Sequence, residues 1–254
     1  MRFASLGSGS RGNATLIQSA TTTLLVDCGF SLRETESRLQ RFGITAQDID
    51  AILVTHEHGD HVKGIGAFAR KYRVPVWMTY GTAQSPKFGV IPCFEELVME
   101  QDTVIGDITV TPFSVPHDAA EPCQFKFGHA GYSLGLLTDT GMITPHIVTM
   151  LSGIDALLLE CNHDVEMLAQ SEYPATLKVR VGSDYGHLNN GQAVSLLQQM
   201  DTDNLKCIVA MHLSEQNNTP HLVKQSLSDA LNWQTRDIVV AHQDLGLDWL
   251  TINE

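Results

Sequence analysis

The stretch His56-Glu57-His58-Gly59-Asp60-His61 directly follows the apolar run Ala51-Ile52-Leu53-Val54-Thr55. The apolar run predicts a buried strand, and the polar stretch lies where that strand ends and a helix begins. If the chain is extended over its first residues, His56 and His58 point to the same side, because extended residues alternate with a period of two. The turn that follows carries Asp60 and His61 toward a second position. An imidazole pair beside a carboxylate–imidazole pair indicates a site for two adjacent divalent ions.

Composition limits the function. The 254-residue chain carries 16 Lys and Arg against 29 Asp and Glu, which gives a net charge of −13 with His neutral. This acidity argues against a broad basic surface for nucleic acid, although bound cations would place positive charge where a phosphate must sit. No run approaches the ~18 apolar residues of a membrane span, and Met1–Gly7 lacks the apolar core of a signal peptide. We therefore expect a cytoplasmic protein without a membrane partner.

The chain is expected to form one domain, residues 1–254, because no linker, charge block or repeat divides it. Strands are predicted at 3–6, 14–18, 23–26, 51–55, 74–78, 108–115, 124–127, 132–137, 156–159, 207–211 and 238–241. Amphipathic helices are predicted at 32–42, 61–72, 190–200 and 220–231. Five cysteines without a Cys-x-x-Cys pair indicate reduced thiols rather than a disulfide framework.

Several predicted strands deliver an acid or an imidazole at one end. These residues are Asp27, His56, His117, Asp139, Glu160 and His212. Random placement would spread such residues among loops at both ends of the strands. We therefore expect the strand ends to converge on one edge of a sheet system, where α/β proteins commonly place their chemistry.

These residues give the chain a clear resemblance to the metallo-β-lactamase superfamily. The His-x-His-x-Asp-His signature matches at every defining position, and Asp27, His117, Asp139 and His212 follow the family order around it. The resemblance covers essentially the whole chain. It implies an α/β fold, a four-layer αββα sandwich with a dinuclear metal site at one edge.

The resemblance also implies a role for each matching residue. One ion would be held by His56, His58 and His117. The second would be held by Asp60, His61 and His212, with the Asp139 carboxylate bridging the two. The residue matching Asp27 is not a ligand in this family; it is buried and organises the metal loops.

Four further motifs narrow the resemblance. They are Leu6-Gly7-Ser8-Gly9-Ser10-Arg11-Gly12-Asn13, Glu160-Cys161-Asn162-His163-Asp164, Gly186-His187-Leu188-Asn189-Asn190 and His212-Leu213-Ser214-Glu215-Gln216-Asn217-Asn218-Thr219-Pro220. Together they resemble the WalJ-type single-domain bacterial exonucleases, although Asn189 stands where that group usually has Ser. Antibiotic-hydrolysing members of the superfamily usually have Cys where this chain has Asp139, which favours phosphodiester or ester hydrolysis.

The resulting prediction is a dinuclear-metal-dependent phosphodiesterase. Its expected activity is 5′-to-3′ exonuclease cleavage of double-stranded DNA through a metal-activated hydroxide, with two divalent ions per chain. His-rich ligation suits Zn, while the carboxylates also admit Mn or Fe. Asp60 and His187 are the expected catalytic residues, and His187 is either a proton donor to the leaving oxygen or a phosphate clamp. DNA as the substrate rests on the resemblance alone.

Two alternatives remain open. A small-molecule metallohydrolase of the same fold, cutting a thioester, lactone or cyclic phosphodiester, fits the acidic composition and would show a closed apolar pocket. An inactive binding module is the other, but every ligand position carries a competent residue. The sequence does not define the oligomeric state.

The glycine-rich turn is a candidate phosphate-binding element, because such turns present backbone N–H groups and hydroxyls. Purely steric reasons for its glycines are an equal alternative. Six residues are candidate substrate contacts: Ser8, Ser10, Arg11, Asn13, Asn162 and His163. Glu160 is expected to support the site by accepting a hydrogen bond from a ligand imidazole. Residues 171–185 form a candidate substrate-contacting loop.

Overall fold

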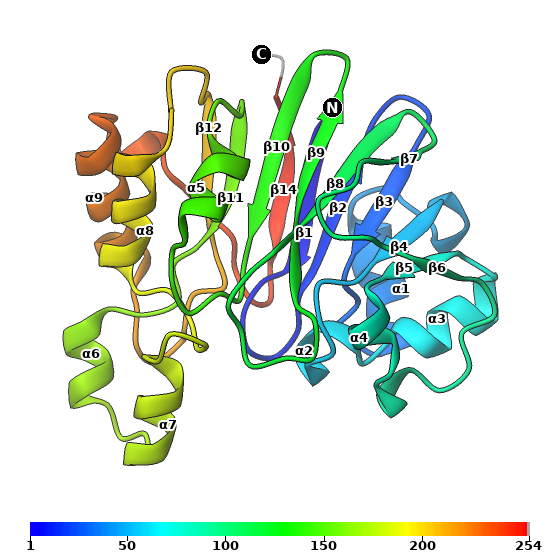
Figure 1. Ribbon diagram of the computed structural model, residues 1–254, viewed down its shortest axis with the longest axis horizontal. Helices are drawn as coiled ribbons and strands as arrows, with labels where there is room; N and C mark the ends of the chain where they lie inside the picture. Colours follow the sequence, from blue (N-terminus) through cyan, green and yellow to red (C-terminus); the bar gives the residue numbers. More distant parts are fainter. Residues whose placement is uncertain (253–254) are drawn as a thin grey trace.

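Short strands form the first sheet, and all but its two edge strands are almost wholly buried, as expected for a sheet covered on both faces. The computed structural model describes residues 1–252. The strands are β1 (Arg2–Gly7), β2 (Ala14–Gln18), β3 (Thr23–Val26), β4 (Ala51–Leu53), β5 (Val76–Met78), β6 (Phe94–Glu96) and β14 (Leu247–Thr251). They stand in the order β14-β1-β2-β3-β4-β5-β6 (Figure 1). The chain pairs antiparallel up to β3 and parallel from β3 to β6.

A second sheet with the same number of strands faces the first. Its strands are β7 (Thr103–Ile105), β8 (Ile108–Ser114), β9 (Cys123–His129), β10 (Tyr132–Leu137), β11 (Ala156–Glu160), β12 (Cys207–Met211) and β13 (Val239–Val240). They stand in the order β13-β12-β11-β10-β9-β8-β7, antiparallel from β7 to β10 and parallel from β10 to β13. Both sheets are therefore mixed.

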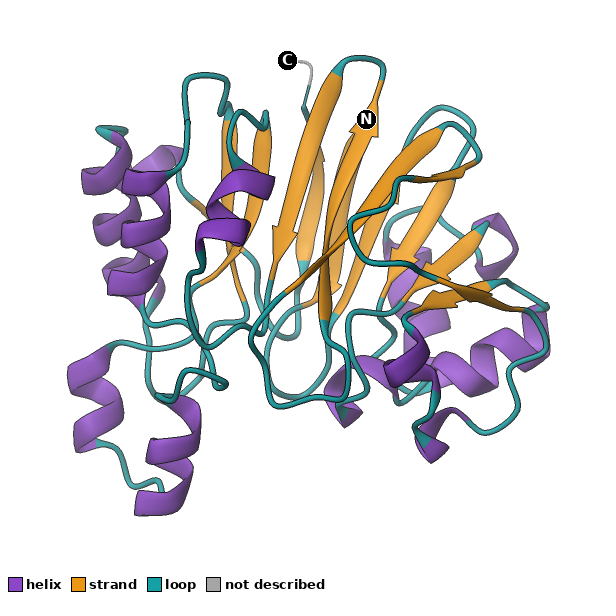
Figure 2. Cartoon of the chain, in the orientation of Figure 1, coloured by secondary structure: helices purple, strands orange, loops and turns teal. Residues whose placement is uncertain are grey.

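Most helices lie on the outer faces of the two sheets, and the others lie at one edge of the sandwich (Figure 2). They are α1 (Leu32–Arg41), α2 (Gly59–Val62), α3 (Ile65–Tyr72), α4 (Tyr80–Ala83), α5 (Pro145–Leu151), α6 (Val165–Gln170), α7 (Ala175–Val181), α8 (Asn190–Gln199) and α9 (Pro220–Leu231). Short 3₁₀ helices lie at Ala46–Asp48, Pro86–Phe88 and Thr235–Asp237. Within residues 1–252, none of these helices combines the length and the apolar character needed to cross a bilayer.

Separate layers of buried side chains confirm the predicted αββα sandwich. One layer, with Phe3, Phe125 and Phe127, joins residues of both sheets and fills the space between them. A second layer packs the other face of the first sheet against α1 and α3, around residues such as Phe68. A third packs the other face of the second sheet against α5, α8 and α9, around residues such as Leu196. Each sheet thus buries both faces, and the apolar strands of the sequence have this physical cause.

The single helix predicted over residues 61–72 is wrong, because the chain breaks into α2 and α3 at Gly64. The Gly64 N–H donates to the Cys28 carbonyl at 2.8 Å. A Cβ atom at this position would lie 2.3 Å from the Phe30 carbonyl oxygen. The close approach of the Cys28–Phe30 backbone therefore redirects the helix axis. The break also frees α2 to carry part of the histidine-rich stretch on a short, separately oriented turn.

Several elements were not predicted at all. The strands β6, β7 and β14 and the helices α4, α5, α6 and α7 fall in this group. All three residues of β6 are exposed, and α7 contains no buried residue, so neither carries the periodic burial that marks an element in the sequence. The segment 171–185, predicted as a loop, contains α7.

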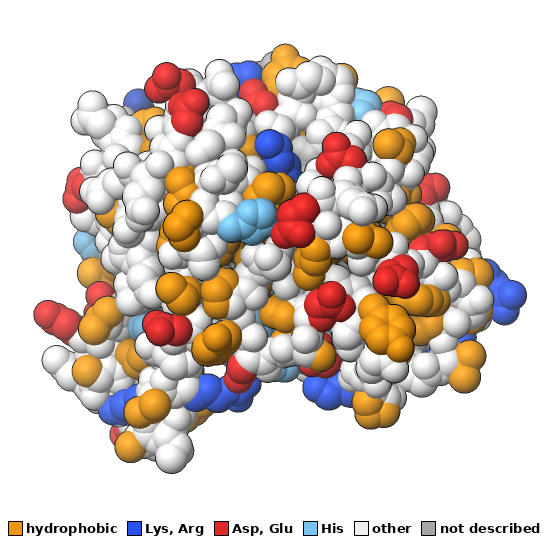
Figure 3. All heavy atoms as spheres, in the orientation of Figure 1, with side chains coloured by type: hydrophobic (Ala, Val, Ile, Leu, Met, Phe, Trp, Pro, Cys, Tyr) orange, Lys and Arg blue, Asp and Glu red, His pale blue; other side chains and the backbone are white. Residues whose placement is uncertain are grey.

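The predicted convergence of the strand ends is confirmed. The loops that follow β3, β4, β8, β10, β11 and β12 come together at one edge of the sandwich, the lower edge in Figure 1. The helices α2, α6 and α7 lie at this same edge. Lys and Arg side chains are visible there on the face drawn in Figure 3, over α7, which carries Lys178 and Arg180.

Candidate metal centre

The loop between β4 and α2 directs His56 and His58 to one point, as the extended-chain argument predicts. His58 precedes α2 in an extended conformation, with φ −67° and ψ 149°. The two imidazole centroids are 4.6 Å apart, and His117, arriving from the end of β8, lies 4.8 Å from His56. One ligand nitrogen from each of these histidines falls within 4.8 Å of the others. This is a three-imidazole pocket for one cation.

Each of these imidazoles has one nitrogen fixed by an outer partner. The Nδ1 of His117 lies 3.0 Å from the Gly186 carbonyl oxygen, and the Nε2 of His58 lies 3.2 Å from that of Asp118. In His56 the Nδ1 lies 3.0 Å from the Thr55 hydroxyl. Carbonyl acceptors fix the tautomer so that the opposite nitrogen keeps its lone pair for a cation.

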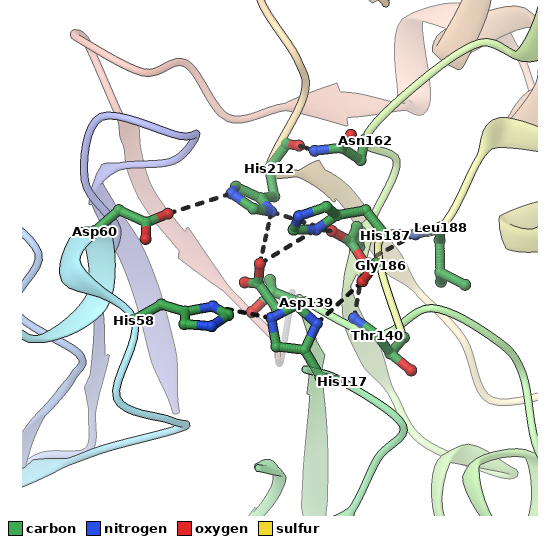
Figure 4. A network of polar contacts seen from close by, with 12 residues as sticks. His58, Asp60, His117, Asp139, Thr140, Asn162, Gly186, His187, Leu188 and His212 are labelled. Atoms are coloured by element: carbon green, nitrogen blue, oxygen red, sulfur yellow. Dashed lines mark hydrogen bonds and ion pairs between the residues drawn. The ribbon is translucent and has the colours of Figure 1, made fainter. Parts of the chain in front are cut away.

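A second group adjoins the first. The ligand atoms of Asp60, His61 and His212 lie within 4.8 Å of one another. The carboxylate of Asp139 stands between the two groups, with its Oδ2 3.1 Å from the Nε2 of His61. Asp139 also forms a compact set with His56 and His61. Asp139 therefore lies where the resemblance expects a bridging carboxylate. Figure 4 shows it together with His58, His117, His187 and His212.

Unpartnered polar atoms test whether these groups fit cations. The Nε2 atoms of His56 and His212 and the Oδ2 of Asp139 are buried and have no hydrogen-bond partner. The His61 Nε2, 3.1 Å from this oxygen, is not a donor to it when the ring carries its proton on the Nδ1 that faces Asp27. The Nε2 of His117 faces the Nδ1 of His58 at 3.2 Å, although the outer contacts place a lone pair on both atoms. Buried lone pairs without partners are costly, and divalent cations at their meeting points would satisfy all of them. The residues therefore fit a divalent metal site.

Asp27 supports the metal loop from the end of β3. It is 3% exposed, and its carboxylate accepts hydrogen bonds from the Thr55 N–H at 2.9 Å and the Thr55 hydroxyl at 2.8 Å. Its Oδ2 also lies 2.8 Å from the Nδ1 of His61. Asp27 thus fixes His61 directly and His56 through Thr55, which agrees with the supporting role implied by the resemblance.

Glu160, at the end of β11, supports the site as Asp27 does, by contacting imidazoles with its carboxylate. Its Oε1 lies 2.9 Å from the Nδ1 of His187 and 3.1 Å from the Nδ1 of His212. Its Oε2 accepts from the Thr140 and Leu188 N–H groups. Burial would raise the pKa of Glu160, but the imidazoles of His187 and His212 hold it at about 2. The ionised carboxylate is therefore placed to receive hydrogen bonds from both imidazoles, as the sequence led us to expect of Glu160.

The pKa values of His56 and His187 are shifted in opposite directions. Burial lowers the pKa of His56 well below its ordinary value, which keeps the imidazole neutral, as a metal ligand must be. Burial also acts downward on His187, but the carboxylates of Glu160 and Asp139 outweigh it and raise the pKa of His187 to about 9. Bound cations would oppose this upward shift.

Three site residues have left-handed backbones. The φ angles are 60° for Asp27, 52° for Asp139 and 55° for His212. This region is sparsely populated by non-glycine residues, and such strain gathers at functional sites. All three residues follow strands, and the sharp turn aims each side chain at the shared edge.

A cavity of about 430 Å³ opens beside the candidate ligands. On its metal side lie His58, Asp60, Asp139, His187 and His212. A neutral polar side is formed by Ser10, Asn162, Ser214 and Asn217. Tyr173, Leu177, Arg180 and Val181, from α7 and the residues just before it, form the third side. The cavity is therefore charged on one wall and mixed on the others.

The structure divides the predicted substrate contacts. Ser10 and Asn162 line the cavity. Ser8 and Asn13 hold ligands instead: the Ser8 hydroxyl accepts from the His212 N–H at 2.8 Å, and the Asn13 carboxamide lies 3.0 Å from the Nε2 of His61.

The other predicted contacts lie outside the lining of the cavity. Arg11 is paired with Glu215 and Asp244 at 2.9 and 2.8 Å. His163 is 2% exposed, with an unpartnered Nδ1.

Sequence reasoning missed three residues of this region. Thr55 links Asp27 to His56, and only its position directly before the histidine stretch hinted at this. Asp118 is exposed in the loop after β8, and it lies beside His58 and pairs with Arg180 at 2.7 Å. Asn217 was quoted within a motif and given no role, although it lines the cavity.

The αββα sandwich with a His/Asp cluster at one edge defines a metal-dependent hydrolase. The chain belongs to the metallo-β-lactamase superfamily, because residues 22–212 match the family model described as the beta-lactamase superfamily domain. It is 39% identical to the exodeoxyribonuclease YycJ of Bacillus anthracis over 91% of this chain and 89% of that protein. It is 34% identical to the exodeoxyribonuclease WalJ of Streptococcus pneumoniae over 91% of this chain and 88% of that protein. The resemblance to WalJ-type hydrolases is confirmed.

Solved structures confirm the fold alone. The metallo-beta-lactamase fold protein YhfI of Bacillus subtilis superimposes with a TM-score of 0.75 at 16% identity, covering 98% of this chain and 99% of that one. Zinc-bound PqqB of Methylobacterium extorquens superimposes with a TM-score of 0.73 at 18% identity, covering 98% and 100%.

Proposed function

We propose that this protein is a dinuclear-metal-dependent 5′-to-3′ exonuclease that acts on double-stranded DNA. The observation that carries the metal-dependent hydrolysis is the set of buried, unpartnered ligand atoms on His56, Asp139 and His212 at one sheet edge. The similarity to two exodeoxyribonucleases over about nine-tenths of the chain supports DNA as the substrate. The proposed cofactor is two Zn, Mn or Fe ions.

The ligands divide between the two ions as their geometry groups them. His56, His58 and His117 would hold one ion. Asp60, His61 and His212 would hold the other, with Asp139 between the two. When bound, two such ions supply a hydroxide nucleophile at neutral pH and neutralise charge on the phosphate.

His187 and Asp60 supply the remaining chemistry in this proposal. The Nδ1 of His187 is engaged by Glu160, so its Nε2 is the nitrogen that remains for substrate. The ring lines the cavity, where a proton on Nε2 can pass to the leaving oxygen or hold a phosphate oxygen. Asp60 also lines the cavity, with its Oδ2 3.6 Å from the Nε2 of His61. There it orients the attacking group against the phosphorus.

A small-molecule hydrolase is the second candidate, and two observations favour it. The chain carries a net charge of −13, and a cavity of about 430 Å³ also suits a metabolite. Relatives that cut polymeric DNA argue for the first candidate. Both candidate functions use the same metal centre. They differ in the substrate, which is a DNA duplex in the first and a small molecule in the second.

The test is digestion of duplex DNA labelled at either end, with Mn²⁺ added. We expect stepwise shortening from the 5′ end by the native protein, and its loss in His58→Ala. His221→Ala is the matched control, because His221 is exposed on α9 and outside the cavity lining. No cleavage by protein that carries two metals would overturn DNA as the substrate. Cleavage by His58→Ala at the native rate would overturn the metal assignment.

A further inference from the structure

The third side of the cavity comes from α7 and the residues just before it. With α6, this helix forms a hairpin that extends from the sandwich at the edge that carries the candidate metal ligands (Figures 1 and 2). Leu177 and Val181 are four residues apart and therefore share one face of α7. Both line the cavity, together with Tyr173. No residue of α7 is buried, so this apolar face is only half covered. An apolar face left open toward an active-site cavity is suited to an apolar part of the substrate.

Asn217 also lines this cavity. It is 1% exposed, and neither its Nδ2 nor its Oδ1 has a hydrogen-bond partner. Its backbone is fixed, since its N–H donates to the Ser214 hydroxyl at 3.2 Å and its carbonyl accepts from the Asp164 N–H at 2.8 Å. A buried carboxamide with both groups unpaired is costly. A ligand that offers one donor and one acceptor would satisfy it.

We propose that these residues form a nucleobase subsite, in which the terminal base packs against Leu177 and Val181 while Asn217 hydrogen-bonds to its edge. Apolar and aromatic side chains hold any base face, and a carboxamide complements the donor and acceptor pattern of a base edge. The phosphate of the same nucleotide would lie on the metal side. A cavity of about 430 Å³ has a volume that suits one nucleotide.

The inference rests on the proposed nuclease function and specifies its substrate further. A base in a duplex is stacked, and its Watson–Crick edge is engaged by its partner. It can enter the cavity only after the terminal pair opens, as in enzymes that extrude a base from the helix. The enzyme should therefore engage an unpaired terminal nucleotide and degrade a duplex faster where its end frays.

The test compares DNA ends that carry an unpaired terminal nucleotide with or without its base. We expect the native enzyme to favour the base-bearing end over an abasic end by at least about fivefold in kcat/KM, the loss expected for one base contact. Leu177→Ala should bring this ratio close to one. Val179→Ala is the matched control, because Val179 lies on α7 but is 72% exposed and outside the cavity lining. Equal kcat/KM for both ends in the native enzyme would overturn the proposal.

A binding measurement separates this proposal from the nuclease function. Calorimetric titration with deoxyadenosine 5′-monophosphate and with deoxyribose 5-phosphate needs no cleavage. The native protein should bind the nucleotide at least about fivefold more tightly, and Leu177→Ala should lose this preference while Val179→Ala keeps it. Equal affinities would overturn the subsite even if DNA is cleaved. A native preference without DNA cleavage would support the subsite and overturn the nuclease function.

Discussion

Asp27→Asn tests whether the buried carboxylate in contact with His61 sets the metal affinity of the site. The Asp27 Oδ2 lies 2.8 Å from the Nδ1 of His61, and a carboxylate there accepts a hydrogen bond from the ring N–H. The Thr55 N–H donates to the Oδ1 position, so an Asn side chain would keep its oxygen there and place its NH₂ at the Oδ2 position. This NH₂ is a donor, so His61 would accept on Nδ1 and carry its proton on Nε2. The Nε2 is the atom that faces Asp139, and in that tautomer it has no lone pair for a metal. Loss of such an outer partner typically weakens metal binding 10- to 100-fold, or about 1.4–2.7 kcal/mol.

The assay is a competition titration of metal affinity with a chromophoric chelator. Asp155→Asn is the matched control. The Oδ2 of Asp155 accepts from the Ser133 N–H at 2.8 Å, but Asp155 precedes β11, whereas Glu160 at the far end of that strand belongs to the site. This control should lower the Tm and leave metal affinity unchanged. Native metal affinity in Asp27→Asn would refute the tautomer argument, as would an equal loss in both variants.

Three further predictions concern stability and metal removal. In a urea titration, Gly64→Ala should lower the free energy of unfolding by about 1–3 kcal/mol, because its Cβ would lie 2.3 Å from the Phe30 carbonyl oxygen. In the same titration, Gly128→Ala should lower it by less, because the new Cβ would lie 3.7 Å from the Thr109 Cβ. Hydrogen bonds from Ser19 and Thr22 lower the pKa of Asp107 to about 2. Its stabilisation is therefore complete above its unfolded pKa near 3.9 and is lost as the pH falls toward 2; Asp107→Asn should flatten the acid limb of a Tm-versus-pH curve between pH 4 and 2, and an unchanged limb would contradict this. Chelation should abolish hydrolysis and lower the Tm, and added Mn²⁺ should restore both; unchanged activity in metal-free protein would refute the metal role.

The sandwich could be predicted because its central strands carry a local signal. Residues of β3 and β4 are all buried, so both read as continuous apolar runs bounded by polar residues. β14 lacks that pattern, and its place is set by antiparallel pairing with β1 at the other end of the chain. The helix α7 was missed because a helix that lines a cavity buries little against the protein. A local sequence pattern predicts an element that packs against the core, and it does not predict an element whose side chains face a cavity.

The residues of the candidate site also divide into those that a local sequence pattern predicts and those that it does not. The side chains that meet at the edge could be predicted, since a strand end with an acid or imidazole is a local pattern. Their supports could not, because they depend on contacts between distant parts of the chain. Arg11 was predicted to contact phosphate, yet its partners Glu215 and Asp244 are 204 and 233 positions away. The Arg11 guanidinium belongs to an ion-pair network that the neighbouring sequence does not predict.

The metal centre and the fold depend on the same contacts. The loop after β4 belongs to the first sheet and carries His56, His58, Asp60 and His61, while His117, Asp139 and His212 follow strands of the second. Cations held between the two sets would therefore tie the sheets together at one edge. Without them, unpartnered atoms and the left-handed backbones of Asp139 and His212 remain uncompensated there. Metal binding would remove the energetic cost of these unpartnered atoms in the folded chain. A substitution of a metal ligand should therefore change both the metal affinity and the stability of this edge. A substitution at the opposite edge of the sandwich should change stability without changing metal affinity.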